Sequence, residues 1–298
     1  MRSFKKISEY MEKNSLNLFE SIMNMEALDL DCSTKEVFDS MSKRLDDMRM
    51  SMVEASRKIW TPKIVCNDSV KMKKYRAEKN TLSGDFINRA SEIALSIATF
   101  NASMGRIVAA PTAGSCGILP GLLFSWEEHR GSQSKDITEG LIVAAAVGQI
   151  IASRATLAGA EGGCQAECGA AVAMGSAALV WMECRKADQC FHAAAICLKS
   201  IMGLVCDPVA GLVEVPCIKR NGSLVALAVL SADMAMAGIQ SIIPPDEVVD
   251  AMYKVGKSLP LSLRETGRGG IAASRTGIFI AAELKKNIPT LESNILNH

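Results

Sequence analysis

Residues 169–182 read GAAVAMGSAALVWM, an uncharged stretch in which alanine and glycine dominate. Two further segments are also rich in alanine and contain one charged residue each, 140–158 (GLIVAAAVGQIIASRATLA) and 223–236 (SLVALAVLSADMAM). Each is long enough to form a helix, and small side chains allow neighbouring helices to approach closely. We therefore predict that these three segments pack together as a buried helical bundle.

The rest of the chain favours the same fold class. No regular alternation of β-branched strands with helical stretches is present, which disfavours a doubly wound sheet. Hydrophobic residues make up 49% of the chain, enough for a sizeable core, and with only 5% aromatics small aliphatic side chains and 16 methionines must fill it. The predicted fold is all-α, a helical bundle whose glycine-rich loops carry the site. Glycine and proline clusters that separate the helices lie at 111–121, 159–163, 203–222 and 266–270.

The N-terminal part looks distinct, and we predict a helical segment over 1–62 followed by the main domain over 63–298. Ser33 and Glu36 have the spacing of a capping box, in which each side chain binds the other residue's backbone amide. Apolar residues then recur every three or four positions, which predicts one stripe on an amphipathic helix. The stripe consists of Val37, Met41, Leu45, Met48, Met52, Ala55 and Ile59.

Charge and cysteine content limit the class of protein. With 33 basic and 32 acidic residues the chain lacks the basic surface that nucleic-acid binding needs. The first residues mix Glu and Lys with apolar residues, unlike an export signal. The longest uncharged run, 107–126, contains two prolines and several glycines and is not expected to span a membrane. We therefore expect a cytoplasmic protein whose ten cysteines stay reduced, as core residues or as ligands.

Two glycine-bearing loops contain the most unusual cysteines. One is 161–168 (EGGCQAEC) and the other is 203–217 (GLVCDPVAGLVEVPC). Glycine beside cysteine lets backbone amides approach the sulfur, and such contacts tune a thiolate-bound metal centre. The spacing of Cys164 and Cys168 also suits half of a zinc site. Two unrelated core thiols remain a third interpretation of that spacing.

Several motifs together resemble one enzyme family, the α subunit of bacterial iron–sulfur-dependent L-serine dehydratase. The resemblance covers about residues 80–277 and implies a lyase that converts L-serine to pyruvate and ammonia. The motifs are GGCQAE at 162–167, the loop 203–217, AAPTAGS at 109–115, DEVVDAMY at 246–253 and LRETGRGG at 263–270.

The resemblance also implies a cofactor. In this family three cysteines hold a [4Fe–4S] cluster, and the matching positions are Cys164, Cys206 and Cys217. Cys168 falls where the family usually has an aliphatic residue, and Cys116 at an optional small residue, so neither is included. Three thiolates leave one of the four irons with an open position. That iron can act as a Lewis acid on the β-hydroxyl of serine.

The general base is not evident from the motifs. The chain has three histidines, His129, His192 and His298, and none lies in a family motif. Some family members fuse this domain to a small α+β domain that brings a Ser-Ser-His segment to the site, and others supply it as a separate β subunit. We therefore expect a hetero-oligomer in which a β subunit carries the base.

Substrate binding is assigned to polar loop residues. A hydroxyl- and amide-rich turn at 112–115 suits a carboxylate, two residues lie in loops similar to family loops, and residues 264–266 suit the carboxylate and ammonium of an amino acid. Helix capping is the alternative role for all of these side chains. The predicted substrate-binding residues are Ser83, Asn101, Thr112, Ala113, Gly114, Ser115, Arg264, Glu265 and Thr266.

The sequence is also compatible with two other functions. A related enzyme could eliminate from threonine or cysteine rather than serine. A non-catalytic helical protein could instead bind zinc through four thiolates, which would leave no open coordination position. The four thiolates in that case are Cys164, Cys168, Cys206 and Cys217.

Overall fold

The computed structural model describes residues 2–66, 68–78, 80–131 and 133–286. Over these ranges the chain is all-α, as predicted, and forms no β-strand. The α-helices are α1 (Phe4–Asn14), α2 (Leu18–Leu30), α3 (Thr34–Ser56), α4 (Asp68–Glu78), α5 (Gly84–Ala102), α6 (Ile118–Arg130), α7 (Ser134–Arg154), α8 (Gly159–Gly162), α9 (Ala170–Cys184), α10 (Ala187–Ile201), α11 (Cys217–Met236), α12 (Pro245–Ser258) and α13 (Arg275–Lys286). Four short elements are 3-10 helices, η1 (Ala113–Ser115), η3 (Val209–Gly211), η4 (Leu261–Leu263) and η5 (Gly270–Ala273). One more, η2 (Gln165–Gly169), is a short π-helix.

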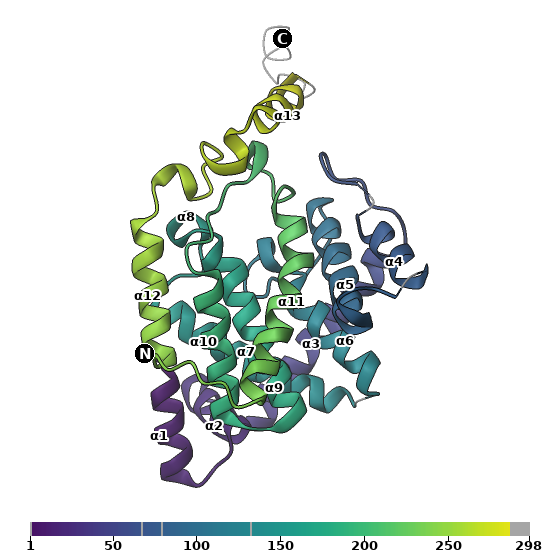
Figure 1. Cartoon of the computed structure of the whole chain (residues 1–298). Helices are drawn as coiled ribbons and strands as arrows, with labels where there is room; N and C mark the ends of the chain where they lie inside the picture. Colours follow the sequence, from purple (N-terminus) through teal and green to yellow (C-terminus); the bar gives the residue numbers. More distant parts are fainter. Residues whose placement is uncertain (1, 67, 79, 132, 287–298) are drawn as a thin grey trace, which may run out of the picture.

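Helix α9 forms the centre of the bundle. Every residue from Ala170 to Met182 is buried, because α6, α7, α10 and α11 pack around it (Figure 1). A helix that is apolar on all sides is expected at such a position. Helix α7 is long and apolar enough to cross a membrane, but 67% of its most apolar stretch is buried inside the protein. It is therefore explained as a core helix of the same bundle.

Glycines allow the close helix contacts that the alanine-rich segments predict. A Cβ atom on Gly117 would stand 2.3 Å from the Ala94 carbonyl oxygen, and one on Gly121 would stand 2.6 Å from that of Ala90. Both distances are shorter than van der Waals contact, so α6 approaches α5 this closely only because both positions are glycine.

The predicted helix bounds need correction at two places. Helix α7 begins at Ser134 and ends at Arg154, so the predicted segment 140–158 is shifted toward the N-terminus. Helix α11 begins at Cys217 rather than at 223, although Gly222 suggested a break there. A Cβ on Gly222 would stand 2.7 Å from the side chain of Leu95, so this glycine serves close packing against α5 and does not end a helix.

The predicted capping box and apolar stripe of the N-terminal part can be compared with helix α3. The capping box is confirmed, since the Ser33 amide donates to Glu36 Oε2 (2.8 Å) and the Glu36 amide donates to Ser33 Oγ (3.2 Å). Ile59 lies beyond the end of α3 and is 57% exposed, so it is wrong as a member of the stripe. Buried residues of α1–α3 join one core with the main bundle. The stripe residues that are buried are Val37, Leu45, Met48 and Ala55.

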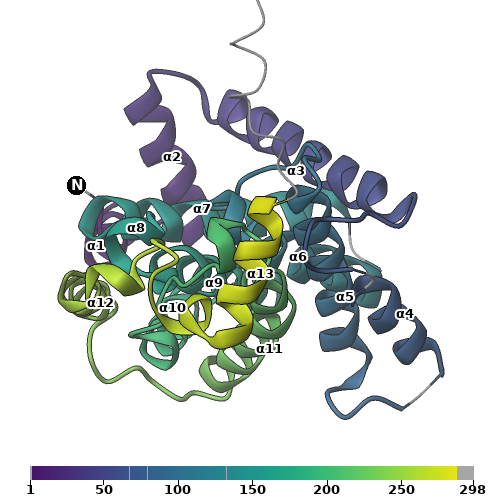
Figure 2. The same ribbon diagram turned by 90° about the horizontal axis from the view of Figure 1, so that it is seen from above.

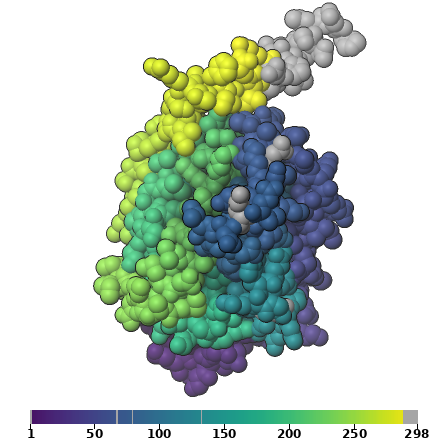
Figure 3. Space-filling view, turned by 45° about the vertical axis from the view of Figure 1, so that its right-hand side comes forward, coloured from purple at the N-terminus to yellow at the C-terminus, as the bar shows by residue number. Residues whose placement is uncertain are grey.

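The loops that carry the predicted motifs gather at one end of the molecule. Figure 1 shows α8, the η3 loop and α13 together at that end, with α1 and α2 at the opposite end. Viewed from above, α13 crosses over the ends of the central helices (Figure 2), and the space-filling view shows it lying on top of the bundle (Figure 3). The bundle thus presents one loop-built face in which chemistry-bearing side chains can meet.

Candidate functional site

The two predicted cysteine loops come together at this loop-built end. Cys164 directly precedes η2, Cys206 lies in the loop after α10, and Cys217 is the first residue of α11. The sulfurs of Cys164 and Cys168 are 3.4 Å apart, because residues four apart on a helical turn share a face. Cys164 also makes a side-chain hydrogen bond with Cys206. All four cysteines are buried.

Gln165 joins the two loops. Its backbone amide donates to the Leu204 carbonyl (3.1 Å), and its side-chain Oε1 accepts a hydrogen bond from the Gly203 amide (2.9 Å). Its Nε2 donates to the Met252 carbonyl of α12 (3.0 Å). This buried amide therefore fixes the segment that leads into Cys206 against the segment that follows Cys164.

Cys206 is also held by backbone hydrogen bonds on its other side. Its amide donates to the Leu263 carbonyl (2.9 Å), and its carbonyl accepts from the Glu265 amide (2.7 Å). This bridge brings the predicted residue Glu265 to the site. The pKa of Cys206 is raised chiefly by its hydrogen bond with Cys164 and that of Glu167 chiefly by burial, and the negative charge of Glu265 adds to both. The motif at 263–270 therefore contributes to the site through its backbone as well as through a side chain.

The two neighbours of Glu265 bond to their own segment instead. Arg264 donates through Nε to the Leu259 carbonyl (2.9 Å) and through Nη2 to the Lys257 carbonyl (3.3 Å). Thr266 Oγ1 donates to the Leu261 carbonyl (3.2 Å). Both side chains thus stabilise the turn after α12, which is the capping type of role left open for them.

The thiol of Cys164 has a lowered pKa. Its side-chain hydrogen bonds with Cys168 and Cys206, together with the positive charge of Arg220, hold this pKa well below its usual range. The same hydrogen bonds to Cys164 raise the pKa of Cys168 and of Cys206. Burial, then the Cys164 charge, raises the pKa of Cys217 to about 12. Cys164 is therefore the thiol of this group that loses its proton most easily, and thiols bind metals in the deprotonated form.

Glu167 lies beside these sulfurs and is a functional candidate that the sequence predictions missed. Its Oε1 accepts a hydrogen bond from Thr112 Oγ1 (2.8 Å), and its Oε2 lies 3.8 Å from the Cys206 sulfur. Burial, followed by the negative charge of Cys164, raises the pKa of Glu167 to about 7. The signal in the sequence is an acidic side chain three residues after a motif cysteine in a glycine-rich loop.

Two glycines make room for the Glu167 carboxylate. A Cβ on Gly159 would stand 2.5 Å from Oε2 of Glu167 and 3.1 Å from the Cys206 sulfur. A Cβ on Gly114 would stand 3.0 Å from Oε1. Any side chain at Gly159 would displace the carboxylate. Glycines of two separate loops therefore make room for it.

The hydroxyl-rich turn is placed next to Glu167. Asn101 Nδ2 donates to the Ala113 carbonyl (3.1 Å), and Asn221 Nδ2, which the sequence predictions missed, donates to the Gly114 carbonyl (2.7 Å). Ser115 is fully buried, so it stabilises the turn rather than facing solvent. The predicted residues that gather here are Asn101, Thr112, Ala113, Gly114 and Ser115.

Ser83 is not brought to this group. It precedes the first residue of α5 and accepts a hydrogen bond from Asn88 Nδ2 (2.8 Å). Asn101 stands near the other end of the same helix, about 27 Å away along the axis at 1.5 Å per residue. The structure thus separates two residues that were predicted to share one substrate site.

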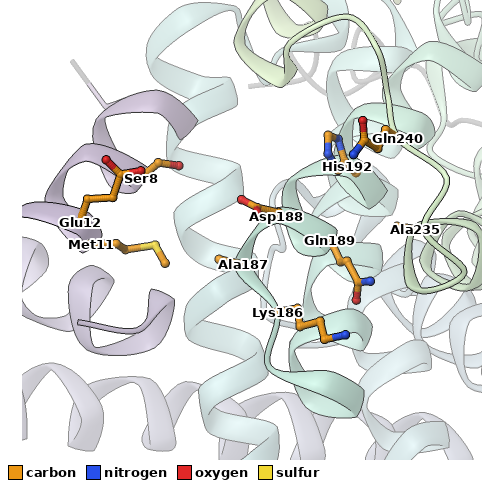
Figure 4. Close-up of a pocket in the computed structure, with 11 residues that line it drawn as sticks. Ser8, Met11, Glu12, Lys186, Ala187, Asp188, Gln189, His192, Ala235 and Gln240 are labelled. Carbon is orange, nitrogen blue, oxygen red and sulfur yellow. The ribbon is translucent and has the colours of Figure 1, made fainter. Parts of the chain in front are cut away.

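The histidines occupy other parts of the molecule. His129 is bound through Nε2 to Asp85 Oδ2 (3.0 Å), near the start of α5. His192 lines a separate cavity of about 570 Å³ between α1 and α10, together with Glu12 and Asp188 (Figure 4). His298 lies outside the described residues. The hydrogen bonds of the two described histidines go to Ser125, Asp85 and Ser241, and none goes to the cysteines or to Glu167.

The donor set consists of buried free thiols, a ligand type that suits iron–sulfur clusters and also zinc. Cys164, Cys168, Cys206 and Cys217 all belong to it. In an iron–sulfur cluster each cysteine binds a different iron, so buried thiols side by side suffice.

Comparison with known proteins agrees with the motifs. The family described as "Serine dehydratase alpha chain" matches residues 6–272. A protein named "Probable L-serine dehydratase, alpha chain" from Bacillus subtilis is 42% identical over 96% of this chain and 95% of its own length. "L-serine dehydratase, alpha chain" from Peptoniphilus asaccharolyticus is 39% identical over 96% and 99%. "L-serine dehydratase TdcG" of Escherichia coli is 36% identical over 68% of this chain but only 46% of its own length.

Proposed function

This chain belongs to the serine dehydratase α-chain family, and on that premise we propose that it is the α subunit of an iron–sulfur L-serine dehydratase. The family resemblance predicted from the motifs is thereby confirmed. The observation that carries the proposal is the buried group of thiols beside a carboxylate and a hydroxyl-rich turn. The reaction removes the α-proton and the β-hydroxyl of L-serine, and the aminoacrylate product then tautomerises and hydrolyses to pyruvate and ammonia.

Cys164, Cys206 and Cys217 are the proposed ligands of a [4Fe–4S] cluster. When bound, the cluster supplies a Lewis acid that makes the β-hydroxyl of serine a better leaving group. The lowered pKa of Cys164 favours the thiolate form, which is the form that binds a metal. The backbone hydrogen bonds of Cys206 fix the position of this second ligand. Cys168 stays outside the proposed ligand set, as the family pattern implies.

The neighbouring polar groups are proposed to bind the amino-acid part of the substrate. The backbone amides of the η1 turn and the Thr112 hydroxyl suit the serine carboxylate. The carboxylates of Glu167 and Glu265 place negative charge where the substrate ammonium can bind. Together these groups would hold the amino acid beside the thiols.

A separate β subunit is proposed to supply the general base. No described histidine reaches the site, and the relatives that match this chain end to end are named α chains. By contrast, the chain spans under half the length of the E. coli relative. A reducing, cytoplasmic setting is part of the proposal, since all ten cysteines are free thiols.

The proposal is tested by coexpressing the chain with a β chain, loading the cluster anaerobically, and measuring 2-oxo acid release from L-serine, L-threonine and L-cysteine. We expect pyruvate from L-serine, and only when both chains are present. Full turnover by the α chain alone would contradict the assignment of the base to the partner. Preference for threonine or cysteine would favour the related elimination, and no turnover of any substrate would favour a non-catalytic protein.

A further inference from the structure

We propose that Arg220 is a positioning residue that fixes the three ligand-bearing segments of the site relative to one another. The proposal rests on the proposed function, because it concerns the thiols assigned to the cluster. Arg220 lies in the first turn of α11, three residues after Cys217, and its side chain is only 14% exposed. It is therefore anchored to the segment of one predicted ligand by the helix itself.

The guanidinium group reaches the second ligand segment on both sides of Cys206. Its Nη1 donates to the Val205 carbonyl (2.9 Å), and its Nη2 donates to Asp207 Oδ1 (2.9 Å). Two donors fixed in one plane thus hold the residues immediately before and after Cys206. This arrangement limits both translation and rotation of the loop, which a single hydrogen bond would not do.

The third ligand segment is reached through the sulfur of Cys164. Arg220 makes a side-chain hydrogen bond with Cys164 and places a positive charge beside its thiolate. Arg220 thus contacts the segments of Cys164 and Cys206, and it belongs to the helix that begins with Cys217. Since thiolate ligands bring negative charge into a buried site, a fixed cation is expected to stabilise the loaded state.

Asp207 extends this connection to the motif at 263–270. Its Oδ2 accepts a hydrogen bond from the Ile271 amide (2.7 Å), and the side chain is 3% exposed. A Cβ on Gly270 would stand 2.3 Å from Oδ2, so the motif glycine is required for this contact. Arg220 and Asp207 therefore form a buried ion pair. Their other backbone hydrogen bonds join Val205, next to Cys206, and Ile271, next to the motif at 263–270.

The test compares R220K and R220Q with wild type and with K219Q. Lys219 is the adjacent residue on α11, but its side chain is 58% exposed and pairs with Asp68 (2.7 Å) outside the thiol group. After anaerobic cluster loading, the readouts are iron and sulfide per chain, the rate of iron release to a chelator, and the electron paramagnetic resonance signal of the reduced cluster. Thermal unfolding of each cluster-free chain monitors the fold.

Removing an outer residue that orients metal ligands typically costs about 10–100-fold in metal affinity. We expect R220Q to release iron about 10–100-fold faster than wild type, R220K to lie between them because it keeps the charge but not the planar fork, and K219Q to match wild type. If R220Q does not fold, R220K against K219Q decides the question. Iron release from R220K as slow as from K219Q, with an unchanged resonance signal, would overturn the proposal for Arg220. A wild-type chain that binds no iron and sulfide would overturn the proposed function, and this inference with it.

Discussion

Thr112 Oγ1 donates a 2.8 Å hydrogen bond to Oε1 of Glu167, although the two residues are 55 positions apart in the chain. The contact joins the hydroxyl-rich turn to the segment that follows Cys164. It places a carboxylate of raised pKa between the proposed substrate-binding turn and the sulfur of Cys206. The site is thus assembled from loops of several motifs, and substitutions in any of them are expected to affect the same chemistry.

The stability of the cluster-free chain should depend on pH through Glu167. Its pKa is raised from an ordinary 4.5 to about 7, chiefly by burial, so the folded chain binds this proton more tightly than the unfolded chain does. Its contribution is fully present below about pH 4.5 and is lost as the pH rises through about 7, by up to about 3 kcal/mol. Urea unfolding at several pH values should show wild type losing stability relative to E167Q over this window. Parallel pH profiles would contradict the placement of Glu167.

Gly159→Ala should disrupt the site without disrupting the bundle. The added Cβ would stand 2.5 Å from the Glu167 carboxylate and 3.1 Å from the Cys206 sulfur, so both groups must shift. We expect cluster loading and turnover to fall about tenfold or more, which corresponds to about 1.4 kcal/mol. The matched control is Gly148→Ala, whose Cβ would meet only the flexible side chain of Met174 at 3.0 Å. Equal cluster loading in the two variants would argue against this steric account.

Glu214 should prove important for holding the site loop to the N-terminal part of the chain. Its carboxylate is 2% exposed and accepts hydrogen bonds from three consecutive backbone amides, those of Lys63 (3.0 Å), Ile64 (2.6 Å) and Val65 (3.1 Å). E214Q removes part of this acceptor set, and we expect a loss of about 1–3 kcal/mol in the free energy of unfolding.

The measurement for E214Q is denaturant unfolding combined with hydrogen exchange at residues 63–65. The control is E9Q, since Glu9 is 59% exposed and its pair with Lys5 (3.8 Å) is of the weak surface type. Faster exchange confined to 63–65 in E214Q, and absent in E9Q, is the expected pattern. Unchanged exchange at these amides would show that they do not depend on Glu214.

The ligand assignment separates Cys206 from Cys168. Both are buried and both contact Cys164, so they match in environment but differ in their assigned role. C206S should abolish the cluster absorbance and its iron, whereas C168S should keep both. If the two variants lose iron to the same extent, the three-ligand set is wrong and a four-thiol site becomes the better description.

Much of the architecture could be predicted from sequence because it follows from local patterns. The capping box at Ser33 and the buried alanine-rich helix around 170–182 depend on spacing and composition alone. The start of α11 could not be predicted in this way, since Gly222 breaks an isolated helix but fits one that packs tightly against Leu95. Tertiary contact decided the bounds where local propensity pointed the other way.

The candidate site shows the same division. The motifs predicted that the loops of Cys164 and Cys206 belong to one site, and these loops do lie together. They gave no role to Glu167, Arg220 or Asn221, because the contacts of these side chains lie in other loops of the fold. Ser83 shows the opposite failure. It lies in a family-like loop, yet the length of α5 separates it from the turn at Thr112.

The most direct test of the central claim is the iron and acid-labile sulfide content of the anaerobically purified chain, measured together with zinc. We expect a brown protein with about four irons and four sulfides per chain, because the proposed cofactor is a [4Fe–4S] cluster on three thiolates. A colourless protein with one zinc per chain would contradict it, because a single tetrahedral ion with four thiolates leaves no position for substrate.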